Sequence, residues 1–247
     1  MYTQYIKEHA SLLNRDVEYK IYGHGGKPCL VFPAQDKRFY DYEDHGMIAV
    51  LEPYLENGQL QIFAIDSVDS LSWSNHSLSE HERIANHERW FQYVVEEFVP
   101  KVKKINRQDT KIMTTGCSMG ATHALNYFLR RPDLFDSVIA LSGVYHAGYF
   151  FGNYHDPLIY LNSIMDYMAN FPVNHPYLDL YRQSKIILSV GQGAYEEAGL
   201  YGLHELENDF KRLGLDNVTC DYWDCDVNHD WPDWRRQINY YIEQVIK

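Results

Sequence analysis

Residues 111–120, Lys-Ile-Met-Thr-Thr-Gly-Cys-Ser-Met-Gly, carry the pattern that decides the predicted fold class. An apolar-leaning strand runs into the GxSxG signature of residues 116–120, and a helical pattern follows at once. A serine on such a sharp strand-to-helix turn has its hydroxyl pushed clear of the sheet, and the flanking glycines let the backbone turn without Cβ clashes. The motif therefore predicts Ser118 as a nucleophile, although a bare GxSxG arises by chance in roughly one chain in fifteen of this length.

The rest of the chain alternates apolar strands with helical patterns. Strands are predicted at 17–21, 29–32, 60–65, before Ser118, and at 137–141, 186–190 and 218–222; helices are predicted at 46–57, 79–106, 119–130, 200–213 and the C-terminus. Pro100 should kink or divide the helix at 79–106. This alternation predicts an α/β architecture, with a mostly parallel sheet covered by helices on both faces. One domain over residues 1–247 is expected, with a cap-like excursion at about 144–183, where the alternation breaks.

Composition narrows the function classes. The chain has 247 residues, 45% hydrophobic and 23% charged, and a formal net charge of −12, which disfavours nucleic acid as a partner. No apolar run approaches the roughly 18 residues of a membrane span, so no membrane association and a cytoplasmic location are expected. His81 and His87 are six residues apart, and the chain has no HExxH or GxGxxG motif, so neither a metal nor a cofactor is expected.

A serine nucleophile needs a base, and His229 is the favoured candidate among the six histidines after Ser118. His229 follows the last predicted strand, in a loop before a helix that Asp230 could cap. The loops at the carboxyl ends of parallel strands lie on one edge of the sheet, which would bring His229 beside Ser118. His123, by contrast, lies one helical turn after Ser118 and points along its helix.

The acid that orients the histidine is expected in the loop after the strand at 186–190. Glu196 is the first choice and Glu197 its nearest rival, and Asp224 and Asp226 are less favoured alternatives. Both glutamates could instead be exposed carboxylates at a helix start, where negative charge is favourable in any case.

Two backbone amides would hold the oxyanion. The amide of Met119 is the first, at the N-terminus of the helix after Ser118. The second should come from the loop after the strand at 29–32, from Ala34 or Gln35, and Gln35 is preferred. His24-Gly25-Gly26 looks like an oxyanion motif, but it precedes that strand and is interpreted as a turn between strands.

These motifs resemble the putative-esterase family of α/β-hydrolases, which includes S-formylglutathione hydrolases, feruloyl and acetylxylan esterases, enterochelin esterases and mycolyltransferases. The resemblance rests on residues 116–120, on Gly191-Gln192-Gly193-Ala194-Tyr195-Glu196 and on His229-Asp230-Trp231-Pro232-Asp233-Trp234, and it covers the chain from about residue 16. It implies a Ser-Asp/Glu-His triad at Ser118, Glu196 and His229 and no cofactor. Pro33-Ala34 departs from the His-Gly that many members carry after the first core strand.

Aromatic residues crowd the first half of the excursion. Together with Trp73, in the loop after the strand at 60–65, Tyr145 and Phe150 are expected to line an aromatic substrate pocket. An excursion that packs on itself is an equal alternative.

The sequence thus favours a serine carboxylic-ester hydrolase that forms an acyl-enzyme from a small-molecule ester or thioester. An acyltransferase with the same triad and a non-catalytic binding protein remain alternatives. The acyl and alcohol groups and the assembly state, including a homo-oligomer, stay open.

Overall fold

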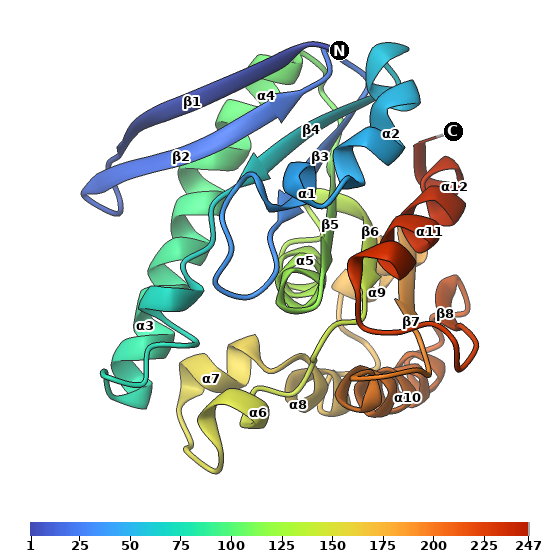
Figure 1. Cartoon of the computed structure of the whole chain (residues 1–247). Helices are drawn as coiled ribbons and strands as arrows, with labels where there is room; N and C mark the ends of the chain where they lie inside the picture. The colour runs from blue at the N-terminus through green and yellow to red at the C-terminus, as the bar shows by residue number, and fades with distance from the viewer. Residues whose placement is uncertain (247) are drawn as a thin grey trace.

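The computed structural model describes residues 1–246 and contains one eight-stranded sheet, in the order β1-β2-β4-β3-β5-β6-β7-β8 (Figure 1). β1 pairs antiparallel with β2 and β2 with β4, and every other neighbouring pair is parallel. The predicted mostly parallel α/β sheet is confirmed. The strands are β1 (Thr3–Ala10), β2 (Arg15–Tyr22), β3 (Lys27–Phe32), β4 (Leu60–Ile65), β5 (Ile112–Cys117), β6 (Phe135–Leu141), β7 (Lys185–Val190) and β8 (Val218–Tyr222).

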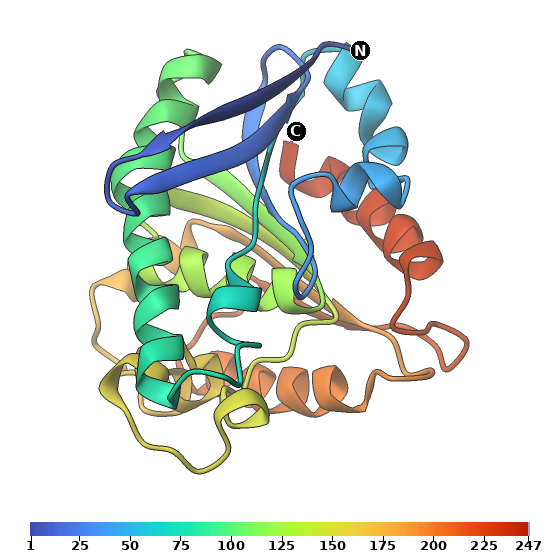
Figure 2. The same ribbon diagram turned by 60° about the vertical axis from the view of Figure 1, so that its left-hand side comes forward.

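Helices cover both faces of the sheet, as Figure 2 shows. One face packs against α3, α4, α5 and α10, and the other against α2 and α11. The helical elements are α1 (Asp41–Asp44), α2 (Met47–Glu56), η1 (Asp69–Leu71), α3 (Glu80–Tyr93), η2 (Val94–Phe98), α4 (Val99–Asn106), α5 (Met119–Arg130), α6 (Gly148–Phe151), α7 (Pro157–Asn162), α8 (Ile164–Ala169), α9 (Tyr177–Arg182), α10 (Glu197–Arg212), α11 (Trp231–Tyr241) and α12 (Glu243–Ile246). Among these, none is long and apolar enough to cross a membrane.

The central and edge strands differ in how much of them is buried. Every residue of β4 and β5 is buried, because helices cover both sides of the strands. β1 is an edge strand whose residues are mostly exposed, and it was not among the predicted strands. Its sequence, Thr-Gln-Tyr-Ile-Lys-Glu-His-Ala, is largely polar, and only its hairpin pairing with β2 makes it a strand.

The predicted helix at 79–106 is present, and a π-helical turn before Pro100, rather than a break, interrupts its α-helical pattern. A capping box between Ser79 and Glu82 starts α3, and a wider π-helical turn, η2, separates it from α4. Pro100 lies in the first turn of α4, where a missing N–H is tolerated. Further along, the excursion at 144–183 contains the short helices α6 to α9, and α10 begins three residues earlier than the predicted residue 200.

The parallel strands place their carboxyl-end loops along a single edge of the sheet. The turn after β5 holds Ser118, the loop after β7 holds Glu196 and the loop after β8 holds His229. Segments more than a hundred residues apart in the chain therefore meet at this edge.

Candidate active site

Ser118 is the single residue between β5 and α5, and its backbone conformation is strained. Its φ is 54° and its ψ is −125°, a backbone region that residues other than glycine rarely adopt. Its amide donates to Leu141 O at 2.9 Å. A Cβ on Gly116 would lie 2.3 Å from the carbonyl carbon of Gly120, and a Cβ on Gly120 would lie 2.3 Å from Phe32 O. Only glycine fits at these two positions, so the two glycines of the motif allow the turn that exposes the Ser118 hydroxyl.

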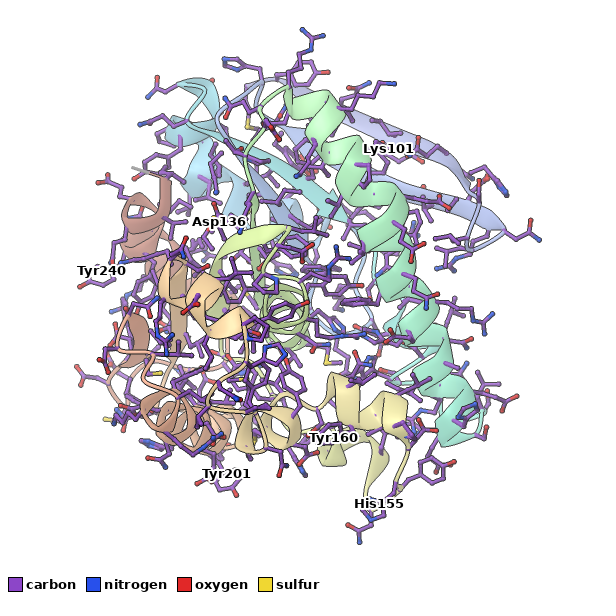
Figure 3. The ribbon with its side chains drawn as sticks, turned by 180° about the vertical axis from the view of Figure 1, so that it is seen from behind. Lys101, Asp136, His155, Tyr160, Tyr201 and Tyr240 are labelled. Carbon is purple, nitrogen blue, oxygen red and sulfur yellow. The ribbon has the colours of Figure 1, made fainter. Side chains whose placement is uncertain are left out.

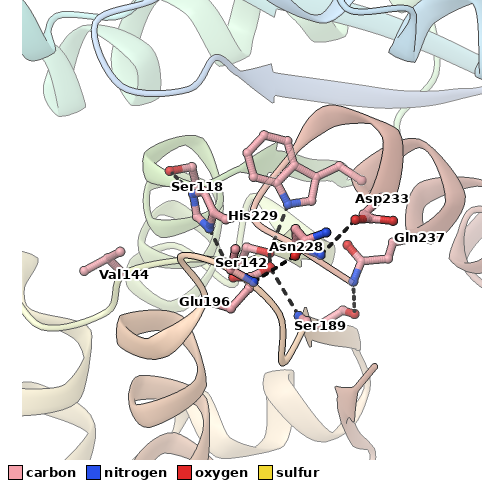
Figure 4. A network of polar contacts seen from close by, with 12 residues as sticks. Ser118, Ser142, Val144, Ser189, Glu196, Asn228, His229, Asp233 and Gln237 are labelled. Carbon is pink, nitrogen blue, oxygen red and sulfur yellow. Dashed lines mark hydrogen bonds and ion pairs between the residues drawn. The ribbon is translucent and has the colours of Figure 1, made fainter. Parts of the chain in front are cut away.

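His229 connects Ser118 to Glu196 (Figure 4). Its Nε2 lies 2.8 Å from Ser118 Oγ, and its Nδ1 lies 3.1 Å from Glu196 Oε2. Because an ionised carboxylate only accepts hydrogen bonds, Nδ1 carries the proton in this arrangement, and Nε2 is free to accept from the serine hydroxyl. The three residues thus form a continuous hydrogen-bonded chain from a buried carboxylate to a partly exposed hydroxyl.

Backbone hydrogen bonds fix the two loops that carry the histidine and the glutamate. The amide of His229 donates to Ala194 O at 3.0 Å, and the amide of Gly193 donates to Val227 O at 2.8 Å. A Cβ on Gly191 would lie 2.1 Å from the same Val227 oxygen, so this glycine lets the loops approach. Backbone contacts therefore hold together the two loops from which His229 and Glu196 project.

Glu196 has partners on both carboxylate oxygens and is only 1% exposed. Its Oε1 accepts from Ser142 Oγ at 2.6 Å and from the Gly191 amide at 3.2 Å, which leaves Oε2 for His229. Ser142 Oγ in turn accepts from Trp234 Nε1 at 2.9 Å. The neighbouring Glu197 is exposed and begins α10, so the structure places only the first of the two candidate glutamates beside His229.

Ser142 and Trp234 belong to the candidate site, although the sequence did not single them out as site residues. Ser142 directly follows the core strand β6 and has a positive φ of 56°, and Trp234 lies on the buried face of α11. A serine directly after a core strand carries no distinctive pattern. Trp234 belongs to the quoted His-Asp-Trp-Pro-Asp-Trp segment, but nothing in that segment shows where its indole N–H points.

The two candidate oxyanion loops lie beside Ser118. Met119 is the first residue of α5, and its side chain is buried. Ala34, in the loop after β3, uses its amide to donate to Asp41 Oδ2 at 3.0 Å, whereas the amide of Gln35 donates to none of the residues that the structure describes. The Gln35 side chain donates from Nε2 to Ser74 Oγ at 3.0 Å.

Two of the three predicted pocket aromatics do not face an open pocket, which corrects that prediction. Trp73 and Tyr145 are each 2% exposed. Trp73 is enclosed by an apolar cluster with Met119 and Phe151, and Tyr145 belongs to the main core, while Phe150 is half-buried against Trp73. Large side chains in these positions were more favourably buried against each other than left as pocket walls.

A groove of about 320 Å³ opens instead between the excursion and α10. It is lined by Val144, His146, Gly148, Tyr149, Gly152, Asn153, Met165, Ala198 and Tyr201. Tyr149 and Tyr201 are 68% and 62% exposed, and Figure 3 shows Tyr201 projecting outward from α10. Tyr201 was missed because the helical pattern of α10 gave no reason to separate its exposed side chains from any other solvated face.

Hydrogen bonds connect one wall of this groove to the turn that carries Ser118, although Ser118 is not among the lining residues. The Val144 amide donates to Thr122 Oγ1 at 3.0 Å, and the Thr122 amide donates to Ser118 O at 3.2 Å. The opposite wall of the groove includes Ala198, which lies two residues after Glu196 in the sequence. No group of three or more metal-ligating side chains occurs within residues 1–246.

Comparison with known proteins identifies the family. The family model described as "Putative esterase" matches residues 37–242, so the chain belongs to this family and is a carboxylic ester hydrolase. No curated protein sequence matches the chain.

Solved structures show the same fold at low sequence identity. A ferulic acid esterase is 16% identical, with a TM-score of 0.74 over 97% of this chain and 95% of that one. An S-formylglutathione hydrolase from Staphylococcus aureus is 13% identical, with a TM-score of 0.70 over 100% and 97% of the two chains. MPT51 from Mycobacterium tuberculosis is 13% identical, with a TM-score of 0.71 over 100% and 98%.

Proposed function

We propose that Ser118, His229 and Glu196 are the catalytic triad of this ester hydrolase and that the reaction passes through an acyl-enzyme. The single observation that carries the proposal is the unbroken chain of hydrogen bonds from Glu196 through both ring nitrogens of His229 to Ser118 Oγ. Serine catalysis requires this arrangement, in which a carboxylate accepts from one ring nitrogen of a histidine and the other ring nitrogen accepts from the serine hydroxyl.

In the first half of the reaction, Ser118 Oγ attacks the carbonyl carbon of the ester or thioester while its proton passes to His229 Nε2. The buried Glu196 carboxylate stabilises the imidazolium that forms. When the tetrahedral intermediate collapses, the bond to the leaving alcohol or thiol breaks, and His229 delivers the proton to it. The acyl group remains on Ser118.

In the second half, water replaces the alcohol. His229 takes a proton from the water, whose oxygen attacks the acyl carbon, and the bond to Ser118 Oγ breaks as the proton returns to that oxygen. The carboxylic acid leaves, and the enzyme is restored without a cofactor.

Two amides are proposed to hold the oxyanion, those of Met119 and Gln35. The Met119 amide lies at the N-terminus of α5, where the helix dipole favours negative charge. Gln35 is preferred over Ala34 because Asp41 already accepts the Ala34 amide hydrogen, and the Gln35 amide has no partner among the described residues.

The groove beside Val144 and Ala198 is proposed to hold part of the substrate, and the excursion at 144–183 to act as its cap. The exposed rings of Tyr149 and Tyr201 favour a planar ring on the acyl or the alcohol part of a small ester. Half-buried Phe150 would support this wall from behind through its contact with Tyr149, at a centroid distance of 5.1 Å.

The proposal is tested by intact-mass spectrometry after treatment with a fluorophosphonate. The wild type and a Ser77→Ala control, which removes an exposed loop hydroxyl, should each gain one adduct, and Ser118→Ala should gain none. Ser118→Ala should also lower kcat by about 10⁴- to 10⁶-fold. A folded Ser118→Ala variant that keeps near-normal esterase activity would refute the assignment.

A further inference from the structure

A second buried histidine–carboxylate pair lies behind the nucleophile and takes no part in the triad. His123, on α5 and five residues after Ser118, places its Nε2 2.8 Å from Asp69 Oδ1. The two side chains are only 7% and 0% exposed. A buried carboxylate that lost its partner would be strongly destabilised, so this contact holds Asp69 firmly against α5.

Asp69 also fixes the loop after β4, in which it begins η1. Its backbone carbonyl accepts from the amides of Ser72 and Ser74, both at 2.9 Å. Ser74 Oγ then accepts from Gln35 Nε2 at 3.0 Å. A continuous path therefore runs from His123 on α5, through the β4 loop, to the exposed loop that carries the Gln35 amide.

The same helix carries the other proposed oxyanion donor. Met119 is the first residue of α5 and lies one helical turn before His123. Trp73, which lies between Ser72 and Ser74, belongs to the same buried cluster as Met119. Its ring centroid is 6.0 Å from that of His123. The β4 loop is thus attached to α5 by the Asp69–His123 hydrogen bond and by apolar packing, and it is attached to Gln35 by Ser74.

We propose that Asp69 and His123 are positioning residues that set the distance between the Met119 and Gln35 amides. The inference rests on the proposed oxyanion site. Donors must lie about 2.7–3.1 Å from the developing oxyanion, and a displacement of about 1 Å is costly in rate. Gln35 lies in an exposed loop, and the path through Ser74 to the buried pair joins it to the rigid helix that carries Met119.

The experiment compares variants of the full chain in ester hydrolysis, beginning with two substitutions of His123. His123→Leu should lower kcat by roughly 10- to 50-fold with KM within about two-fold, since the oxyanion contact forms fully only in the transition state. It should also weaken inhibition by a trifluoromethyl ketone, whose serine adduct carries an oxyanion in the same place. His123→Gln, which keeps an N–H at a similar reach, should recover part of the loss.

His87 provides a matched control. Its imidazole stacks on that of His123 at a centroid distance of 5.0 Å and is 1% exposed, but within residues 1–246 it forms no hydrogen bond with Asp69. His87→Phe should therefore leave kcat within about two-fold. Equal losses in His123→Leu and His87→Phe would assign the effect to packing and overturn the proposal.

Ser74→Ala interrupts the same path at its outer end without disturbing the buried pair, so it serves even where His123→Leu folds poorly. It should lower kcat by roughly three- to ten-fold, and its effect should not add to that of His123→Leu, because both break one path. Multiplicative losses in the double variant, or unchanged kcat in Ser74→Ala, would overturn the inference. A wild type that neither hydrolyses esters nor reacts with a fluorophosphonate would refute the proposed function instead.

Discussion

Replacing Glu196 by glutamine changes the hydrogen-bonding character of the carboxylate with almost no change in shape. Glu196 Oε1 receives two donors, Ser142 Oγ and the Gly191 amide, while Oε2 faces His229 Nδ1 alone. A glutamine has one acceptor oxygen and one NH₂ donor. The oxygen should take the position with two donors, because the reverse orientation would leave the buried Gly191 amide facing another N–H, at a cost of about 1–3 kcal/mol.

The NH₂ group of the introduced glutamine would then donate to His229 Nδ1 and reverse the tautomer of the imidazole. Nε2 would carry the proton and point it at Ser118 Oγ, so it could no longer act as the base. The equivalent change in a serine protease triad lowers kcat by about 10⁴-fold, which corresponds to about 5 kcal/mol of lost transition-state stabilisation. We expect a loss of this order for Glu196→Gln.

The assay is the initial rate of p-nitrophenyl acetate hydrolysis, together with the rate of fluorophosphonate labelling and the melting temperature. Glu197→Gln is the matched control, because it removes the same charge one residue away at an exposed position, and its kcat should stay within about two-fold of the wild type. A folded Glu196→Gln variant with more than a tenth of the wild-type kcat would refute the tautomer argument, and a large loss in Glu197→Gln alone would move the acid to that residue.

Two further predictions concern the groove and the buried histidine. Tyr201→Ala should raise KM about five- to ten-fold in steady-state kinetics, because one ring contact is worth about 1–1.4 kcal/mol. The substrates are benzyl acetate and methyl phenylpropanoate, which carry their rings on opposite sides of the ester. Tyr240, on α11, is about equally exposed, and the same effect in Tyr240→Ala would contradict the prediction. Burial, then the neighbouring His123 and Arg130, holds the pKa of His87 well below its usual 6.5, so the unfolded chain binds a proton there that the folded chain does not. The free energy of unfolding should therefore fall as pH drops below about 6.5, by up to about 1.4 kcal/mol per pH unit from this group. Denaturant unfolding between pH 7.5 and 5 should show a shallower decline for His87→Phe than for the wild type. An identical decline in the two proteins would contradict the assignment to His87.

Much of the fold could be predicted because its signals are local in the sequence. The apolar strands and the helical periodicities follow from residues that are near one another in the chain, and the GxSxG turn is specified within five residues. β1 escaped prediction because its residues are polar and become a strand only through pairing with β2. Pairing between separate segments leaves no such local pattern when the paired strand is exposed.

The candidate catalytic residues were nominated by loop position, but their contacts depend on the tertiary structure. The sequence left Glu196 and Glu197 as rivals, since both lie in the same loop. The folded chain buries the first against Ser142 and Gly191 and turns the second toward solvent. Which of two adjacent carboxylates points inward is decided by backbone conformation, here the positive φ of 65° at Tyr195 just before them.

By itself, the sequence determined the class of fold, the serine turn and the edge of the sheet where its partners gather, because alternating hydrophobicity and glycine spacing act over short stretches of chain. Only the tertiary structure decided which aromatic side chains are buried and which line a groove. Trp73 and Tyr145 pack inward while Tyr149 and Tyr201 remain exposed. All four are aromatic, so residue type does not separate them, and burial depends on neighbours that are distant in the chain.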